Sequence, residues 1–94
     1  MRTIRRTNRF KRDYRREKSG RYSRIIDQEL RIILECLARD EPLARRHFDH
    51  ALTGNWADHR DCHVRPDLIL IYRKPDAETL DLVRLGSHSE LGIK

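Results

Sequence analysis

Residues 68–72 form an uninterrupted apolar run, Leu-Ile-Leu-Ile-Tyr, with Pro66-Asp67 before it and Pro75-Asp76 after it. A short apolar run bounded by turn residues is typical of a strand that is buried on both faces of a sheet. The chain has 94 residues, which is enough for one domain and one compact core. We therefore expect a single domain over residues 1–94, built around this central strand.

Two further strands are expected beside the central run. His59–Arg65 alternates in the manner of a strand, and Thr79–Leu85 is a third strand that ends at Gly86. The Pro-Asp pairs make short connections, so the three strands form an antiparallel meander. The first of these strands would carry His59, Asp61, His63 and Arg65 on one face, and Arg60, Cys62 and Val64 on the other.

The first half of the chain has the pattern of a strand followed by two helices. Thr3–Arg6 can form a short strand, and Thr7 or Asn8 can cap a helix over Arg9–Lys18, which Ser19-Gly20 ends. A second helix runs from near Ser23 to Pro42, with a core-facing stripe of Ile26, Leu30, Ile33 and Leu37. The predicted fold class is α+β, with an N-terminal strand and a helical hairpin packed on an antiparallel β-sheet.

The positive charge is concentrated at the start of the chain. Residues 1–24 hold 11 of the 21 basic residues and only two acidic ones, although the whole chain has a formal net charge of +6. Such a segment is either a solvated basic face, a surface for nucleic acid, or a surface for an acidic protein. Charge alone does not separate these three. The basic side chains on the predicted first helix are Arg9, Lys11, Arg12, Arg15, Arg16 and Lys18.

The composition argues against several classes of protein. No run approaches the roughly 18 apolar residues of a membrane span, and no apolar stretch follows the charged start as in a secretory signal. Cys36 and Cys62 form no CxxC pair and suit a reducing cytosol. The P-loop and the GxGxxG, HExxH and GxSxG motifs are absent from the sequence. His59 and His63 would lie about 13 Å apart on a strand, too far to share one metal ion, so we expect no metal and no cofactor.

The second half of the chain holds a set of titratable side chains. His47 and His59 are expected to be exposed and without a role. An antiparallel meander can bring the others to one edge of the sheet, where they could form a metal-free acid–base site acting on a phosphodiester. These residues are His50, Asp61, His63, Asp67, Arg84 and His88.

The stretch from His50 to Tyr72 closely resembles the YafQ family of bacterial type II toxins, within the RelE/ParE toxin superfamily. The resemblance rests on His50, Gly54, Trp56, Arg60-Asp61, His63, Pro66-Asp67 and the run that ends at Tyr72. Arg84-Leu-Gly86-Ser87-His88 resembles the family's second motif, and Phe10-Lys11-Arg12-Asp13-Tyr14 resembles its opening.

This resemblance implies a cytoplasmic bacterial toxin that cleaves mRNA in the ribosomal decoding site and is silenced by a tightly bound antitoxin. His88 and Asp67 would transfer protons, while His50 and His63 would orient RNA or share that work. Arg84 would stabilise the phosphorane, and Asp61 would orient His63 or a neighbouring Arg. The basic helix would dock on ribosomal RNA or receive an acidic antitoxin segment.

The chain departs from the family pattern near its end. Relatives often carry an aromatic residue four positions after the last histidine, where this chain has Gly92. Trp56 could compensate as a stacking ring, but we expect it to pack on the hydrophobic core. Two rival functions stay open: a ParE-like inhibitor of DNA gyrase, and a non-catalytic module that binds RNA or the ribosome.

Overall fold

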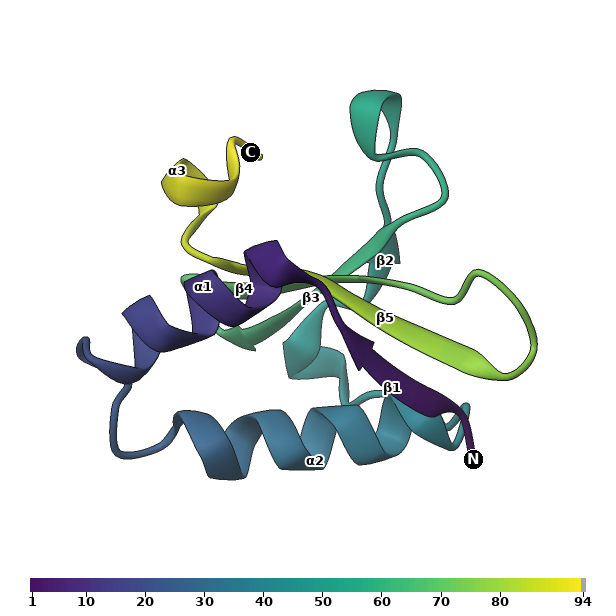
Figure 1. The fold of residues 1–94 in the computed structure, drawn as a ribbon, viewed down its shortest axis with the longest axis horizontal. Coiled ribbons are helices and arrows are strands. Elements are labelled where there is room, and N and C mark those ends of the chain that lie inside the picture. The colour runs from purple at the N-terminus through teal and green to yellow at the C-terminus, as the bar shows by residue number, and fades with distance from the viewer. Residues whose placement is uncertain (94) are drawn as a thin grey trace.

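The computed structural model describes residues 1–93, which form a five-stranded sheet with helices on both faces (Figure 1). The strands are β1 (Thr3–Arg6), β2 (His50–Ala51), β3 (Arg60–Arg65), β4 (Leu68–Arg73) and β5 (Thr79–Gly86). The helices are α1 (Asn8–Lys18), α2 (Ile26–Ala38) and α3 (His88–Leu91), with short 3-10 turns η1 (Arg45–His47) and η2 (Gly54–Trp56). Within residues 1–93 no helix is long and apolar enough to cross a bilayer.

The α+β fold class and the order of its elements are confirmed. The strands lie in the order β1-β5-β4-β3-β2, so the apolar run is central and the β3-β4-β5 meander is antiparallel as predicted. The sheet is mixed, however, because β1 pairs in parallel with β5. The helical hairpin between β1 and the meander is long enough for β1 to run either parallel or antiparallel to β5. In the parallel arrangement, β1 covers the edge of β5 that the meander leaves open.

The helices begin where local hydrogen bonds permit. Thr7 caps α1, because its hydroxyl oxygen accepts a hydrogen bond from the Phe10 amide at 3.1 Å. α2 begins at Ile26, later than predicted from the sequence, because Tyr22, Ser23 and Ile25 lie in turns that connect the hairpin. Its stripe of Ile26, Leu30, Ile33 and Leu37 is buried, as predicted.

Two apolar clusters lie on opposite faces of the sheet. The larger one joins Phe10 and the α2 stripe to alternate strand residues such as Leu70 and Leu82. The smaller one consists of Ile69, Ile71 and Leu91, with Trp56 packed against it, so the structural role expected for Trp56 is confirmed. Helices α1 and α2 therefore cover one face, and α3 covers part of the other.

Candidate active site

The register of the sheet brings several predicted site residues into line. One row of paired residues crosses four neighbouring strands and consists of His50, Asp61, Ile71 and Arg84. In the next row on the same face, His63 pairs with Ile69. Residues opposite each other in a sheet project from the same face. Since Ile69 and Ile71 belong to the smaller cluster, Asp61 and His63 project from the face that carries α3.

His88 is held in place by Asp67 and by the start of α3. Nδ1 of His88 lies 2.8 Å from Oδ1 of Asp67, and the same oxygen accepts the His88 amide at 3.1 Å. α3 starts here because the Ser87 hydroxyl accepts the Glu90 amide while the Glu90 carboxylate accepts the Ser87 amide, a capping box. The hydrogen bonds from His88 lower the pKa of Asp67. Because Nδ1–H of His88 donates its hydrogen bond to the Asp67 carboxylate, the Nε2 nitrogen remains free to exchange a proton.

Three rings form a row beside this pair. The ring centres of His63 and His88 lie 5.3 Å apart in an edge-to-face arrangement, and the ring of Phe48 lies 5.5 Å from that of His63. Burial lowers the pKa of His63, although the nearby Asp61 opposes this shift. His63 is therefore biased towards the neutral form, which can accept a proton.

Asp61 is a buried carboxyl group below the histidines. It is 3% exposed, and its Oδ1 lies 3.1 Å from Nδ1 of His50. That nitrogen makes its hydrogen bond to the Phe48 carbonyl at 2.7 Å, so Asp61 Oδ1 accepts none from residues 1–93. Burial raises the pKa of Asp61, and the three surrounding histidines oppose the shift. The structure thus brings His50, Asp61, His63, Asp67 and His88 together.

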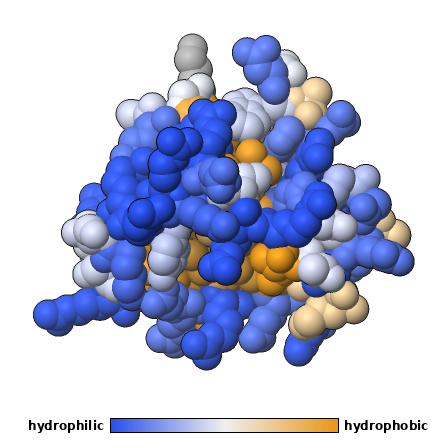
Figure 2. Space-filling view, viewed as in Figure 1, coloured by the Kyte–Doolittle hydropathy of each residue, from blue (hydrophilic) through white to orange (hydrophobic). Residues whose placement is uncertain are grey.

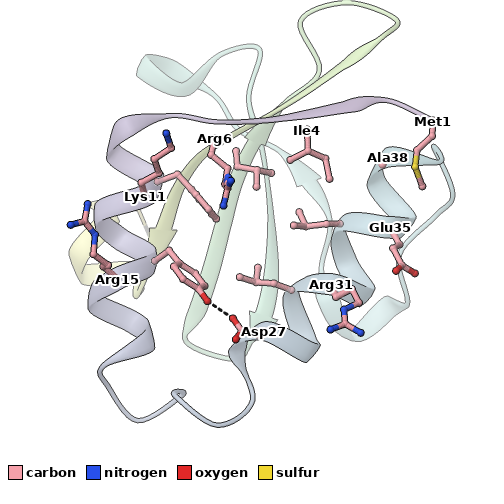
Figure 3. Close-up of a pocket in the computed structure, with 14 residues that line it drawn as sticks. Met1, Ile4, Arg6, Lys11, Arg15, Asp27, Arg31, Glu35 and Ala38 are labelled. Atoms are coloured by element: carbon pink, nitrogen blue, oxygen red, sulfur yellow. Dashed lines mark hydrogen bonds between the residues drawn. The ribbon is translucent and has the colours of Figure 1, made fainter.

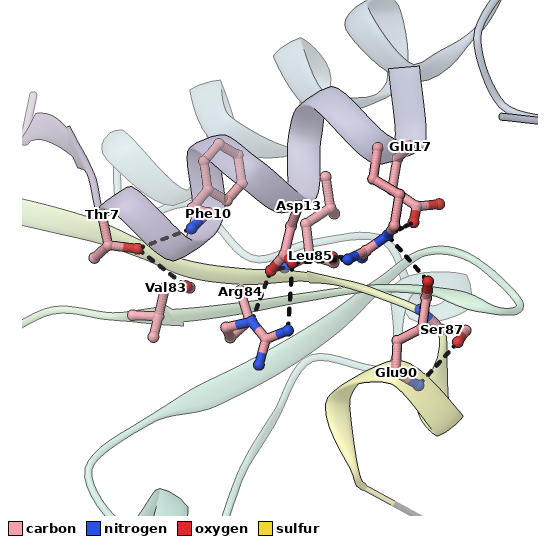
Figure 4. Close-up of polar contacts among 10 residues, drawn as sticks. Thr7, Phe10, Asp13, Glu17, Val83, Arg84, Leu85, Ser87 and Glu90 are labelled. Carbon is pink, nitrogen blue, oxygen red and sulfur yellow. Dashed lines mark hydrogen bonds and ion pairs between the residues drawn. The ribbon is translucent and has the colours of Figure 1, made fainter. Parts of the chain in front are cut away.

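Arg84 points to a different partner. Its Nε and Nη2 lie 2.7 and 3.3 Å from the two carboxylate oxygens of Asp13 on α1, and its side chain is 14% exposed (Figure 4). Burial alone would raise the pKa of Asp13, but hydrogen bonds from Arg84 and from the Leu85 amide outweigh it, and the pKa is lowered. Within residues 1–93, Asp13 is the only polar partner of the Arg84 side chain. The expected contact of Arg84 with the histidine group is therefore not seen.

Arg16 joins α1 to both β5 and α3. Its guanidinium contacts Asp13 at 3.0 Å, the Leu85 carbonyl at 2.9 Å and Glu90 at 3.0 Å. A Cβ atom at Gly86 would lie 2.8 Å from Nη2 of Arg16, so a larger residue there would require this guanidinium to shift. Arg16 therefore supports the segment that carries His88, whereas the sequence predicted an RNA contact.

Of the other basic residues predicted to bind RNA, one forms an ion pair within residues 1–93 and four do not. Lys18 forms an ion pair with Asp27 at 2.7 Å, which reduces its availability to an outside partner. Arg9, Lys11, Arg12 and Arg15 are exposed, and in the described part of the chain they form no ion pair. These four make up the free cationic surface of α1, which we call the α1 basic face.

Sequence reasoning was wrong about His47 and missed Asp13. His47 is 4% exposed, because η1 places it under β3, where its Nδ1 lies 2.7 Å from the His63 carbonyl oxygen. His59 is half-buried and packs edge-on against Trp56, away from the group. The only available signal for Asp13 was its position as one of two acidic residues in a basic segment. In residues 1–93, no three His, Cys, Asp or Glu side chains have the arrangement of a metal site.

A groove lies on the opposite side of the sheet, between α1, α2 and β1 (Figure 3). Its volume is about 710 Å³, and its floor is apolar, formed by Ile4, Phe10, Leu30, Leu34 and Leu82. Hydrophobic atoms are visible there between the hydrophilic surfaces of the two helices (Figure 2). Arg6, Lys11, Arg15 and Arg31 line it as well, with Asp27 and Glu35. The groove is therefore separate from the histidine group and adjoins the α1 basic face.

Comparison with known proteins identifies the family. A family model described as the YafQ bacterial toxin of type II toxin–antitoxin systems matches residues 2–93. The mRNA interferase toxin YafQ of Escherichia coli K12 is 35% identical, over 80% of this chain and 91% of that protein.

Solved structures agree with this match. A metal-bound toxin from Helicobacter pylori is 39% identical, with a TM-score of 0.81 over 97% of this chain and 99% of that one. In the E. coli DinJ–YafQ complex, the matching chain is 29% identical, with a TM-score of 0.78 over 97% of this chain and 98% of that one. On the family match, the fold and the positions of the motif residues, this chain belongs to the YafQ family of bacterial type II toxins.

Proposed function

We propose that this chain is an endoribonuclease that cleaves mRNA in the ribosomal decoding site and is neutralised by a cognate antitoxin. The observation that carries the proposal is the contact of His88 with Asp67, next to the ring of His63. Two imidazoles side by side, one of them oriented by a carboxylate, suit a reaction that removes one proton and delivers another. The names of the E. coli relatives, which are mRNA interferase toxins, support the same reaction.

The proposed reaction is attack by a ribose 2′-hydroxyl on the adjacent phosphorus. The 2′-oxygen forms a bond to phosphorus, the bond from phosphorus to the 5′-oxygen breaks, and the products are a 2′,3′-cyclic phosphate and a 5′-hydroxyl. A base takes the 2′-hydroxyl proton, and an acid gives a proton to the leaving 5′-oxygen. Both groups can be side chains, so the scheme needs no metal ion.

The geometry suggests how the side chains share this work. His88 donates the proton to the 5′-oxygen from Nε2, because the contact of Nδ1 with the Asp67 carboxylate orients the ring and leaves Nε2 free. His63, which burial biases towards the neutral form, accepts the 2′-hydroxyl proton. His50 orients the RNA, and Asp61 stabilises positive charge that develops on His63. In this assignment the acid and the base are adjacent rings.

Arg84 has a narrower role in this scheme than the resemblance implied. Asp13 already binds its Nε and Nη2, which leaves Nη1 for a phosphate oxygen. An arginine held by a carboxylate loses side-chain freedom, and the fixed charge is positioned before the substrate arrives. Arg84 therefore stabilises the phosphorane through one nitrogen, from a position that α1 determines.

Binding to the ribosome and to the antitoxin is proposed to involve the α1 basic face. Its four cations lie on exposed helix surface, where they can follow an RNA backbone. The E. coli relative forms a complex with the antitoxin DinJ. An acidic antitoxin segment suits the same cations and the adjoining apolar groove, so the two partners would compete for this side of the toxin.

The experiment that tests the proposal is induction of the chain alone, with mapping of mRNA 5′ ends. H88A should abolish cleavage and growth arrest while the variant still sediments with ribosomes, because it removes a proton carrier and no phosphate contact. H59A is the matched control, since His59 lies outside the group, and should remain toxic. Undiminished cleavage by H88A would overturn the assignment. Growth arrest with DNA damage and no new mRNA ends would instead indicate gyrase inhibition.

A further inference from the structure

Phe48 is an aromatic residue in an unusual position. The residue is 67% exposed, whereas every other Phe, Tyr and Trp within residues 1–93 is buried or half-buried. Its backbone has φ 44° and ψ 48°, the left-handed region that bulky side chains rarely adopt. Neither core packing nor backbone preference explains a phenylalanine here.

The chain is anchored on both sides of Phe48. On one side, His47 is buried and anchored at the His63 carbonyl oxygen. On the other side, the Phe48 carbonyl oxygen accepts the hydrogen bond from Nδ1 of His50 at 2.7 Å, and β2 begins at that residue. The backbone of Phe48 is therefore held between two anchored histidines, and the residue does not belong to a free loop.

The ring lies directly beside the proposed reaction centre. Its centre is 5.5 Å from that of His63 at an interplanar angle of 53°, and His63 in turn contacts His88. Most of its surface faces solvent, so it can receive a flat ligand. Nucleobases stack on such rings with little dependence on sequence, because every base has a π-face.

We propose that Phe48 is the stacking platform for a nucleobase next to the scissile phosphodiester. The inference rests on the proposed RNA cleavage and adds a substrate subsite to it. At position 92 the chain has glycine at the end of α3, and the one ring on α3 is that of His88, which belongs to the proposed reaction centre. Phe48 approaches the same group of histidines from the η1 side and supplies an aromatic surface there.

The test is single-turnover cleavage of mRNA on programmed ribosomes, with toxin concentration varied. F48L should raise the half-saturating concentration about 5- to 150-fold at an unchanged maximal rate, the range expected for loss of one base–aromatic stack. F48Y and F48W should retain wild-type binding. F48N should bind as poorly as F48L while folding normally, because asparagine adopts the left-handed region readily. I32A, which truncates an exposed apolar side chain on α2, is the matched control and should change nothing.

A second measurement does not depend on cleavage. F48W in a W56F background places the only tryptophan at the platform. Its fluorescence should be quenched by ribosomes that carry an mRNA with 2′-O-methyl groups, which cannot be cleaved. Quenching together with wild-type cleavage by H88A would support the platform and refute the proposed chemistry. No quenching, or a loss confined to the maximal rate in F48L, would overturn the inference, because the ring would then only position His63.

Discussion

Asp13 is a buried carboxylate that contacts two arginines and none of the site histidines. It is 4% exposed and accepts hydrogen bonds from Nε of Arg84 at 2.7 Å, from the Leu85 amide at 3.0 Å and from Nη1 of Arg16 at 3.0 Å. D13N keeps the shape of the side chain but removes its charge. Arg84 and Arg16 then share one amide oxygen where they had a carboxylate.

The expected cost follows from the burial of the pair. Removing one partner of a buried ion pair costs about 3–5 kcal/mol. The Arg84 side chain is 14% exposed to solvent, and the asparagine side-chain oxygen of the variant still accepts a hydrogen bond. We therefore expect D13N to lower the free energy of unfolding by about 2–3 kcal/mol. For a domain of this size that corresponds to a fall in Tm of about 8–24 °C.

The assay is urea unfolding followed by circular dichroism. D58N is the matched control, because Asp58 is exposed at φ 70°, a conformation that asparagine tolerates, and it should lie within about 0.5 kcal/mol of wild type. Equal urea midpoints for D13N and wild type would refute the reasoning, since the carboxylate would then be dispensable.

The same pair makes stability depend on pH in a defined direction. The folded-state pKa of Asp13 is below its unfolded value near 3.8, so the stabilisation is complete above that pH and is lost as pH falls through the folded pKa. D13N should therefore lose less stability than wild type between neutral pH and acid. If D13N and wild type lose the same stability on acidification, Asp13 is not the source of this pH dependence.

Two further predictions concern the surface and the cysteines. Replacing Arg9, Arg12 and Arg15 by Glu should weaken ribosome association and flatten its salt dependence. Arg16 is left intact because it supports α3. If the salt dependence of binding is unchanged, the α1 basic face is a solvated surface only. Cys62 is buried, which raises the pKa of its thiol, so a thiol reagent should label Cys36 in the native toxin and reach Cys62 only after unfolding.

Sequence reasoning succeeded where the signal is local. The stripe of α2 has the period of a helix, and the apolar run of β4 has the length of a strand and turn residues at both ends; both elements are found as predicted. The motif resemblance identified His50, Asp61, His63, Asp67 and His88, which the structure brings together. It could not show that Arg84 faces Asp13, because that contact joins residues 71 positions apart and depends on how α1 crosses β5.

Short elements escaped prediction for a different reason. β2 has two residues and α3 has four, and neither length can establish a hydrophobic period. The burial of His47 depends on η1, which has three residues and no pattern of its own. The parallel pairing of β1 with β5 depends on the path of the hairpin between them, which the residues of β1 alone do not specify.

The contact between the first and last strands bears on how the toxin is made. The Thr7 hydroxyl donates to the Val83 carbonyl, 76 positions away, beside the β1–β5 pairing. Contacts this distant raise the contact order and slow folding, and they cannot form before β5 has been synthesised. β1 and α1 therefore leave the ribosome without their sheet partner. The ion pair of Arg16 with Glu90, which supports α3 and the segment that carries His88, can therefore form only after that closure.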